Sequence, residues 1–222
     1  MPFQLRHLGT ALAGVLAAVL ILFAATLPGR AAEGAPLTIV AFGDSLTAGY
    51  RLPEADAFPT VLQAALRARG WNVTIVNAGV SGDTASAAAA RLDWSVPDGT
   101  DGVLVEVGAN DMLRGIDPAI TRAALDGILG RLKARGIPAL VLGMYASRTL
   151  GADYVAAFER IYPELARKWD DMLYPFFLDG VAQQPALNLD DGMHPNAEGV
   201  RVIVARMLPT VEAFLRTLSG NG

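Results

Sequence analysis

The chain has 222 residues, of which 52% are hydrophobic and 18% are charged, and it contains no cysteine. This length and composition favour one globular domain and argue against a disordered chain. The formal net charge of −4, without a long lysine or arginine run, offers no basic surface for a nucleic acid. Because cysteine is absent, the sequence excludes disulfides, thiolate catalysis, cysteine-ligated zinc and a lipid anchor on an N-terminal cysteine.

The first 31 residues have the pattern of a secretory signal peptide. Arg6 and His7 precede an apolar run over residues 8–27, and the small residues Gly29 and Ala31 fit the last positions before a cleavage site. The run is about 20 residues long, so it could also stay in place as a membrane anchor. We expect a periplasmic or secreted protein whose domain covers residues 32–222, with membrane contact only through an uncleaved leader.

Beyond the leader, short apolar runs alternate with longer segments that carry apolar residues three and four positions apart. The runs predict buried strands and the longer segments predict helices. In chain order these are strand 37–42, helix 58–69, strand 73–76, helix 84–92, strand 102–107, helix 118–135, strand 139–144, helix 152–171, strand 173–178 and helix 197–218. Pro175 weakens the prediction of the last strand. The alternation predicts an α/β fold in which helices cover both faces of a parallel sheet.

Polar residues gather in four loops that adjoin these elements. Three clusters directly follow the first three strands and the fourth precedes the last helix, at residues 43–46, 77–83, 108–111 and 190–196. The carboxyl ends of the strands of an open parallel sheet lie at one edge, and the loops there build the active site. We therefore expect the four clusters to meet at that edge.

Ser45 and His194 are the candidates for nucleophilic catalysis. Ser45 lies just past the first strand, at the expected start of a helical turn, and His194 is the only histidine after the leader. A serine needs a base to lose its proton at neutral pH, and histidine is the usual base. Seen alone, Ser45 could instead cap a helix, and His194 could be a structural or surface residue.

Asp191 stands three residues before His194, close enough on a turn to accept the Nδ1 proton and fix the tautomer of the ring. Asp190 is the competing candidate for this role. The same spacing could ligate a metal ion, but one histidine and no cysteine leave too few ligands for a zinc site. The pattern favours a serine, a histidine and an aspartate acting without a metal.

Acyl transfer also requires hydrogen-bond donors where negative charge develops on the substrate oxygen. Asn110, in VGAND, offers a side-chain amide just past a buried strand. Gly82, in VSGDT, offers a backbone N–H at a point where the backbone can approach a ligand closely. Each residue alone is more typical of an ordinary turn. Their joint position after successive strands favours the functional interpretation.

Apolar residues near the clusters are candidates for contact with an acyl chain, or for plain core packing: Leu46, Met112, Leu113 and Ile116. Residues 145–154 follow the fourth strand and contain Gly151, so they could form a substrate-facing loop that begins at Tyr145.

In this order and spacing, the four clusters resemble blocks I, II, III and V of the SGNH hydrolases. The matching segments are GDSLTAGY, NAGVSGDT, VGAND and DGMHPN, within a resemblance that runs from residue 37 to residue 215. The sequence is most similar to the bacterial branch of periplasmic acyl-CoA thioesterases, arylesterases and lysophospholipases. LRG at 113–115 and YPFFLDGVA at 174–182 support that branch.

The resemblance implies a role for each matching residue. Ser45 would be the nucleophile and a backbone donor to the oxyanion, Gly82 and Asn110 the other two donors, His194 the general base, and Asp191 its orienting acid. It also implies a single-domain, three-layer α/β/α sandwich with a flavodoxin-like, five-stranded parallel sheet. The α/β-hydrolase fold is disfavoured, because the sequence lacks its G-x-S-x-G elbow.

The implied activity is hydrolysis of carboxylic esters and thioesters through an acyl-enzyme, by a monomer that needs no cofactor and no metal. Its partner would be a small acyl ester or thioester. Two other functions stay open. A carbohydrate O-deacetylase would use the same triad. A non-catalytic binding module on a flavodoxin-like fold would need a phosphate-binding loop, and the sequence has no G-x-G-x-x-G or Walker motif.

Overall fold

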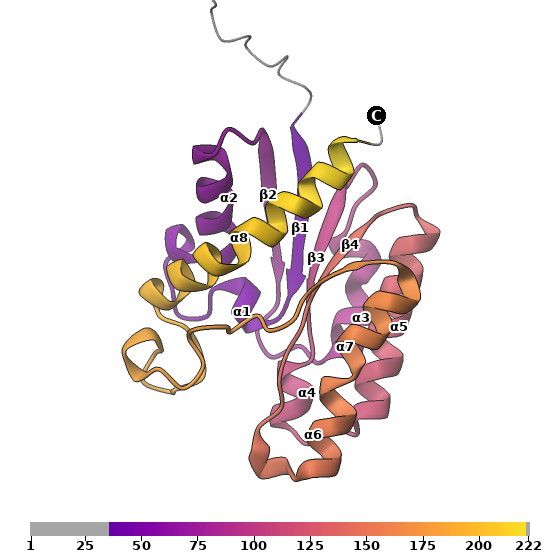
Figure 1. Cartoon of the computed structure of the whole chain (residues 1–222), viewed down its shortest axis with the longest axis vertical. Helices are drawn as coiled ribbons and strands as arrows, with labels where there is room; N and C mark the ends of the chain where they lie inside the picture. The colour runs from indigo at the N-terminus through magenta and orange to yellow at the C-terminus, as the bar shows by residue number, and fades with distance from the viewer. Residues whose placement is uncertain (1–35, 221–222) are drawn as a thin grey trace, which may run out of the picture. The chain divides into compact units, whose positions relative to one another are not determined.

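A computed structural model describes residues 36–220 of the chain. The expected signal peptide, residues 1–31, lies outside the described residues. Within the described range, no helix combines the length and apolar character needed to cross a membrane. This part of the chain forms one α/β domain, in which helices lie on both sides of a parallel sheet (Figure 1).

The sheet has five strands in the order β2-β1-β3-β4-β5, and every neighbouring pair is parallel. The strands are β1 (Leu37–Gly43), β2 (Val73–Gly79), β3 (Gly102–Glu106), β4 (Ala139–Leu142) and β5 (Met172–Tyr174). From β1 in the interior of the sheet, the chain moves to one edge at β2 and returns past β1 to reach the other edge at β5. This is the predicted flavodoxin-like arrangement, and the fold prediction is confirmed.

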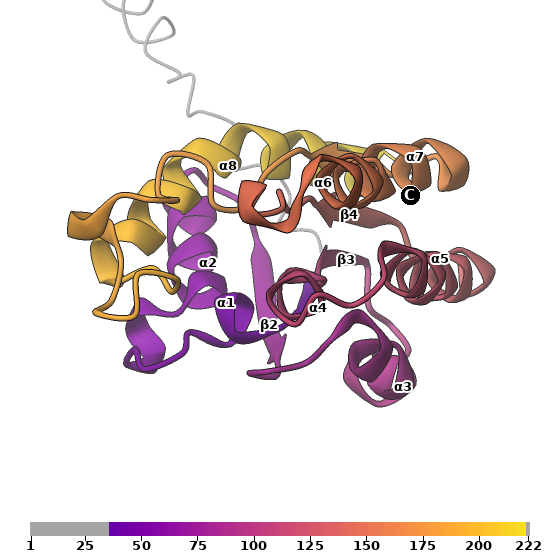
Figure 2. The ribbon, with the colours of Figure 1, turned by 90° about the horizontal axis from the view of Figure 1, so that it is seen from below.

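The helices divide between the two faces as right-handed crossovers require. On one face, α2 packs against β2 and α8. On the other face, α5 packs against α3 and α7 (Figures 1 and 2). The helices are α1 (Ser45–Ala48), α2 (Phe58–Ala68), α3 (Ala85–Ser95), α4 (Ala109–Leu113), α5 (Pro118–Ala134), α6 (Ala152–Glu159), α7 (Ile161–Trp169) and α8 (Ala197–Ser219). Single 3₁₀ turns lie at Glu54–Asp56, Arg148–Leu150 and Pro185–Leu187.

Burial on both faces explains the continuous apolar runs of the inner strands. All residues of β3 and β4 are buried, and in β1 Ile39 to Phe42 are at most 1% exposed. The edge strand β2 differs, because Val73 and Ile75 are buried whereas Val76 is 41% exposed. A strand covered on both faces needs apolar residues at every position, whereas an edge strand needs them at alternate positions.

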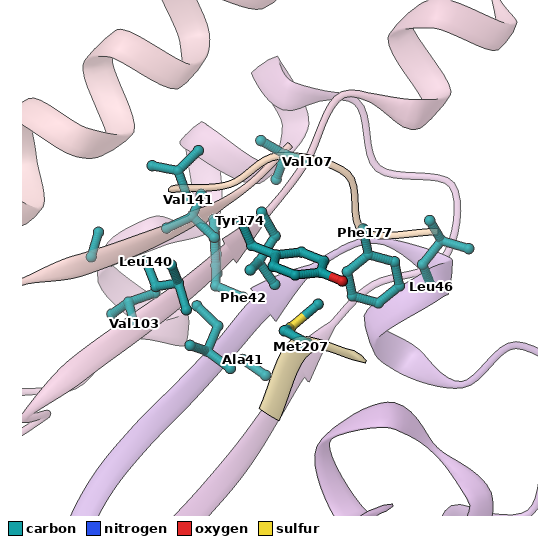
Figure 3. Close-up of a cluster of buried hydrophobic side chains, with 14 of the residues drawn as sticks. Ala41, Phe42, Leu46, Val103, Val107, Leu140, Val141, Tyr174, Phe177 and Met207 are labelled. Atoms are coloured by element: carbon teal, nitrogen blue, oxygen red, sulfur yellow. The ribbon is translucent and has the colours of Figure 1, made fainter. Parts of the chain in front are cut away.

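A part of the hydrophobic core combines side chains from the sheet, from the loop after β5 and from α8. Figure 3 shows Phe42, Leu140, Tyr174, Phe177 and Met207 gathered there. The ring of Phe177 also meets that of Phe58 from α2 edge-on, with 4.9 Å between the centroids. The carboxyl ends of the strands therefore rest on a packed apolar base.

Several predicted elements differ from the structure in extent: β2 and α3 end later than predicted, at Gly79 and Ser95, and β4 ends earlier, at Leu142. Two further elements differ because of a proline. The helix expected over residues 152–171 is broken at Arg160, because Pro163 has no N–H to give to the carbonyl of Glu159 and its ring crowds that carbonyl. The strand expected over residues 173–178 ends at Tyr174, because Pro175 cannot donate to the ladder. The chain is thereby free to place Phe177 in the core.

Candidate active site

Ser45 is the first residue of α1, immediately past the end of β1. Asp44 caps this short helix, and its Oδ1 accepts a hydrogen bond from the Leu46 N–H at 3.0 Å. The alternative in which Ser45 itself is the helix cap is therefore wrong. Ser45 is 8% exposed, and its Oγ lies 2.9 Å from Nε2 of His194.

His194 is held on its other side by Asp191, with 2.8 Å between Nδ1 and Oδ2. The second carboxylate oxygen accepts the backbone N–H groups of Met193 at 2.9 Å and of His194 at 3.0 Å. Partial burial acts to raise the pKa of Asp191, but these hydrogen bonds and the imidazole outweigh it and lower the pKa to about 2. An ionised Asp191 keeps the proton on Nδ1 and leaves Nε2 free to accept from Ser45. This contact is made by Asp191 and not by the competing Asp190.

A short hairpin-like turn and a helix cap fix the position of His194. Its carbonyl accepts the N–H of Leu189 at 2.8 Å, and a single β-bridge pairs Asn188 with Pro195. Asn196 caps α8 through the Gly199 N–H at 3.0 Å. The histidine therefore sits in a braced loop directly before the longest helix.

Asn110 lies in the first turn of α4 and faces the same opening as Ser45. One N–H of its amide donates to Oδ2 of Asp44 at 3.0 Å, which leaves the second N–H for a ligand. The chain turns into α4 at Gly108, whose φ of +113° suits glycine. A side chain there would also collide with the hydroxyl of Tyr162.

The position of Gly82 supports its predicted role less directly than the positions of Ser45 and Asn110 support theirs. It has a φ of +88°, is exposed, and its carbonyl accepts from the Arg114 guanidinium at 2.8 Å. It lies outside the lining of the cavity described below. The structure thus brings Ser45, Asp191, His194 and Asn110 together, and it puts Gly82 on the neighbouring loop.

A cavity of about 540 Å³ opens beside Ser45, and Asn110 and His194 also line it. Its volume is within the range of small-molecule sites. Four of the five residues predicted as candidates for substrate contact line it: Leu46, Met112, Leu113 and Tyr145. Ile116 does not, and its carbonyl accepts from the Tyr154 hydroxyl instead.

Sequence reasoning missed part of this lining because it assigned residues 173–178 to a strand. Phe176 stacks on Tyr145 with 4.4 Å between the ring centroids, and Met144, Leu178 and Met193 add further apolar surface. Pro175 was the available signal in the sequence. Because the strand ends before this proline, the aromatic residues that follow it lie in a loop, where Phe176 can line the cavity.

Residues 41–202 match the GDSL-like lipase/acylhydrolase family. The chain belongs to this family. It is similar to an arylesterase of Vibrio mimicus, 37% identical over 169 residues that cover 76% of this chain and 84% of the relative. It is also similar to thioesterase 1/protease 1/lysophospholipase L1 of Escherichia coli K12, 39% identical over 178 residues that cover 80% and 83%.

Solved structures give the same assignment. The SGNH-hydrolase family esterase AlinE4 superimposes with a TM-score of 0.69 at 46% identity, covering 82% of this chain and 98% of that one. The psychrotrophic esterase EstA from Pseudoalteromonas sp. gives a TM-score of 0.76 at 27% identity, covering 81% and 98%. The predicted family, fold and ester-hydrolase activity are confirmed, and the chain is an ester hydrolase.

A buried acidic pair beneath Ser45 was not predicted. Oε2 of Glu106 accepts the Asp44 N–H at 3.2 Å and the Thr47 hydroxyl at 2.9 Å, while Oε1 meets no donor among the described residues. Gly43 makes room for it, since a side chain there would run into Thr47 and Glu106. The only sequence signal was a carboxylate inside an apolar strand.

Burial raises the pKa of Glu106 well above its usual range, and the neighbouring Asp44 adds to the effect. Burial also raises the pKa of Asp44, although hydrogen bonds from Leu46 and Asn110 oppose the shift. Two neighbouring carboxyl groups that are both buried do not both ionise readily, because each negative charge disfavours the other. We assign the proton to Glu106, because burial and Asp44 both raise its pKa and its Oε1 meets no donor among the described residues.

This assignment predicts how stability depends on pH. The unfolded chain releases the Glu106 proton above about pH 4.5, whereas the folded protein keeps it to a higher pH. This difference in proton binding stabilises the folded protein at low pH, and the stabilisation is lost as the pH rises from about 4.5 toward the pKa of folded Glu106. We expect Glu106→Gln to gain stability relative to the parent protein as pH increases from about 5 to 8.

Thermal or urea unfolding across this range measures the effect, and Glu54→Gln, at an exposed carboxylate, controls for the change in net charge. A stability difference that stays constant with pH would show that Glu106 is ionised in the folded protein.

Proposed function

We propose that Ser45, His194 and Asp191 are the catalytic triad of this ester hydrolase, and that it acts on small acyl esters and thioesters. The observation that carries the proposal is the 2.9 Å contact between Ser45 Oγ and His194 Nε2, two residues that line the same cavity. Asp191 completes the chain of hydrogen bonds at 2.8 Å. The residues are already in line for proton transfer.

In the first step, Ser45 Oγ attacks the carbonyl carbon while His194 Nε2 takes its proton. The tetrahedral oxyanion accepts hydrogen bonds from the backbone N–H groups of Ser45 and Gly82 and from the Asn110 amide. His194 then protonates the leaving oxygen or sulfur, and the bond to the acyl carbon breaks. In the second step the same base activates water, which releases the acid and restores Ser45.

Asp191 acts on the ring and does not take the proton itself. Its pKa of about 2 keeps it ionised throughout the working range, so it stabilises the imidazolium that forms in both steps. The only chemistry needed is proton transfer and covalent catalysis by these side chains. Within residues 36–220, no group of three or more histidine, cysteine, aspartate or glutamate side chains is arranged to hold a metal ion.

The nucleophile is tested by covalent labelling with a fluorophosphonate. We expect one adduct on Ser45, and Ser45→Ala should lose the label and about 10⁴-fold or more of kcat while keeping its thermal midpoint. Ser147→Ala is the matched control, because Ser147 lines the same cavity and bonds Thr149 instead of the histidine. A Ser45→Ala variant that keeps its turnover would remove Ser45 from the mechanism.

The lining of the cavity supports an acyl-chain substrate over an acetylated carbohydrate. Leu46, Met112, Met144 and Phe176 offer apolar surface that an acyl chain can contact. The polar residues of the lining, apart from the proposed catalytic residues and Asn110, are Ser147, Arg148, Gln183 and Asn188. We expect kcat/KM to be higher for p-nitrophenyl octanoate than for the acetate, and matched thioesters to be cleaved. The assay is an acyl-chain series run beside acetylated xylan, and release of acetate from xylan at a higher kcat/KM would favour the O-deacetylase.

We further propose that the leader exports the protein to the periplasm or the medium and is removed after Ala31. The proposal rests on the sequence pattern of residues 1–31. The mass of the exported chain tests it, with an N-terminus at Ala32 expected. A chain that retains the leader would mean an uncleaved anchor.

A further inference from the structure

Arg91, on α3, places a charged side chain beneath two loops, the one after β1 that carries Ser45 and the one after β2 that carries Gly82. The side chain is 19% exposed, and its guanidinium carbon lies 4.5 Å from the centroid of the Phe42 ring. Its donors reach four acceptors: Asp83 Oδ2 at 2.6 Å, Gly43 O at 2.8 Å, Ala78 O at 2.9 Å and Ser95 Oγ at 2.9 Å. One cation therefore joins the end of β1, the end of β2, the loop that follows β2, and its own helix.

The acceptors adjoin the residues that matter for the reaction. Gly43 stands two positions before Ser45, and Asp83 directly follows Gly82. The loop after β2 is also tied to β1 by the Val80 N–H, which donates to the Gly43 carbonyl at 3.0 Å. Arg91 and Val80 thus share one carbonyl acceptor at the base of the nucleophile turn.

Two of the three oxyanion donors assigned above are backbone N–H groups, one on each of these loops. The spacing between two such donors depends on how the loops are held, because neither donor can adjust by rotating a side chain. Displacements of an ångström in a catalytic site can cost about 100-fold in rate. Whatever fixes the two loops to each other therefore acts on the transition state.

Arginine suits this task better than lysine. The guanidinium is planar and always charged, and it directs five N–H donors in a fixed fork. Here the fork serves two backbone carbonyls, a carboxylate and a hydroxyl at once. A lysine ammonium has three donors, so it could bond only part of this set.

We propose that Arg91 is a positioning residue for acyl transfer, which sets the distance between the backbone N–H groups of Ser45 and Gly82. We assign it no contact with the substrate, because its donors bond acceptors of the protein itself. The inference rests on the proposed catalytic role of Ser45. It goes beyond that role by assigning the geometry of the oxyanion site to a residue outside it.

The test compares Arg91→Lys with the matched control Arg131→Lys. Arg131, on α5, also bonds α3, through the Ala89 carbonyl at 2.7 Å and Asp93 at 2.5 Å, but it contacts neither loop. We expect Arg91→Lys to lower kcat by about 10- to 100-fold with KM within about twofold. Rates are divided by the number of sites that a fluorophosphonate titrates, so unfolded protein does not count.

Chemical rescue separates positioning from a general loss of structure. In Arg91→Ala, added ethylguanidinium should restore part of kcat, while ethylammonium at the same concentration should not. Equal losses in Arg91→Lys and Arg131→Lys, a loss confined to KM, or an unchanged kcat per titrated site would overturn the inference. Absence of an adduct on Ser45 in the parent protein would instead overturn the proposed function, so the two failures are distinguishable.

Discussion

The parallel register around the end of β1 is the constraint on which the rest of the site depends. β1 pairs with β2 on one side and β3 on the other, so that Gly43 lies opposite Gly79 and opposite Glu106. The three strands therefore finish at the same level. The loops that carry Ser45, Gly82 and Asn110 start from this line and have only a few residues in which to diverge, which keeps their donors close together.

Charged side chains beneath these loops hold them together, and these side chains are largely buried. Glu106 and Asp44 form a buried acidic pair on the β3 side, while Arg91 joins the loops on the β2 side. A buried polar group is costly unless it is bonded, and Arg91 has four acceptors whereas Glu106 retains an oxygen without a donor among the described residues. Glu106 bonds the Asp44 N–H and the Thr47 hydroxyl, so the pair holds the turn on both sides of Ser45.

Much of this site was accessible from the sequence because chemistry limits the choice of residues. Apart from His7 near the start of the sequence, His194 is the one candidate base, and its spacing to Asp191 fits a turn. Strands buried on both faces also leave a clear signal in unbroken apolar runs. Single residues gave a weaker signal. Pro163 and Pro175 account for the helix break at Arg160 and for the end of β5, which the spacing of apolar residues did not indicate.

What the sequence could not supply were contacts between distant elements. Glu106 is 62 positions from Asp44, and Arg91 is 48 positions from Gly43. Neither pairing follows from local spacing, since it depends on which strands become neighbours. Phe176 escaped notice for a related reason, because its place in the cavity depends on where the loop after β5 turns.

The central claim is that the ends of β1, β2 and β3 assemble one oxyanion site around Ser45. A crystal structure of the protein inhibited by an alkylphosphonate tests it most directly, because the phosphonyl oxygen occupies the place of the oxyanion. We expect phosphorus bonded to Ser45 Oγ and the phosphonyl oxygen within about 2.7–3.1 Å of the Ser45 N, Gly82 N and Asn110 Nδ2 atoms. A phosphonyl oxygen turned away from Gly82 and Asn110, or an adduct on another residue, would contradict the account.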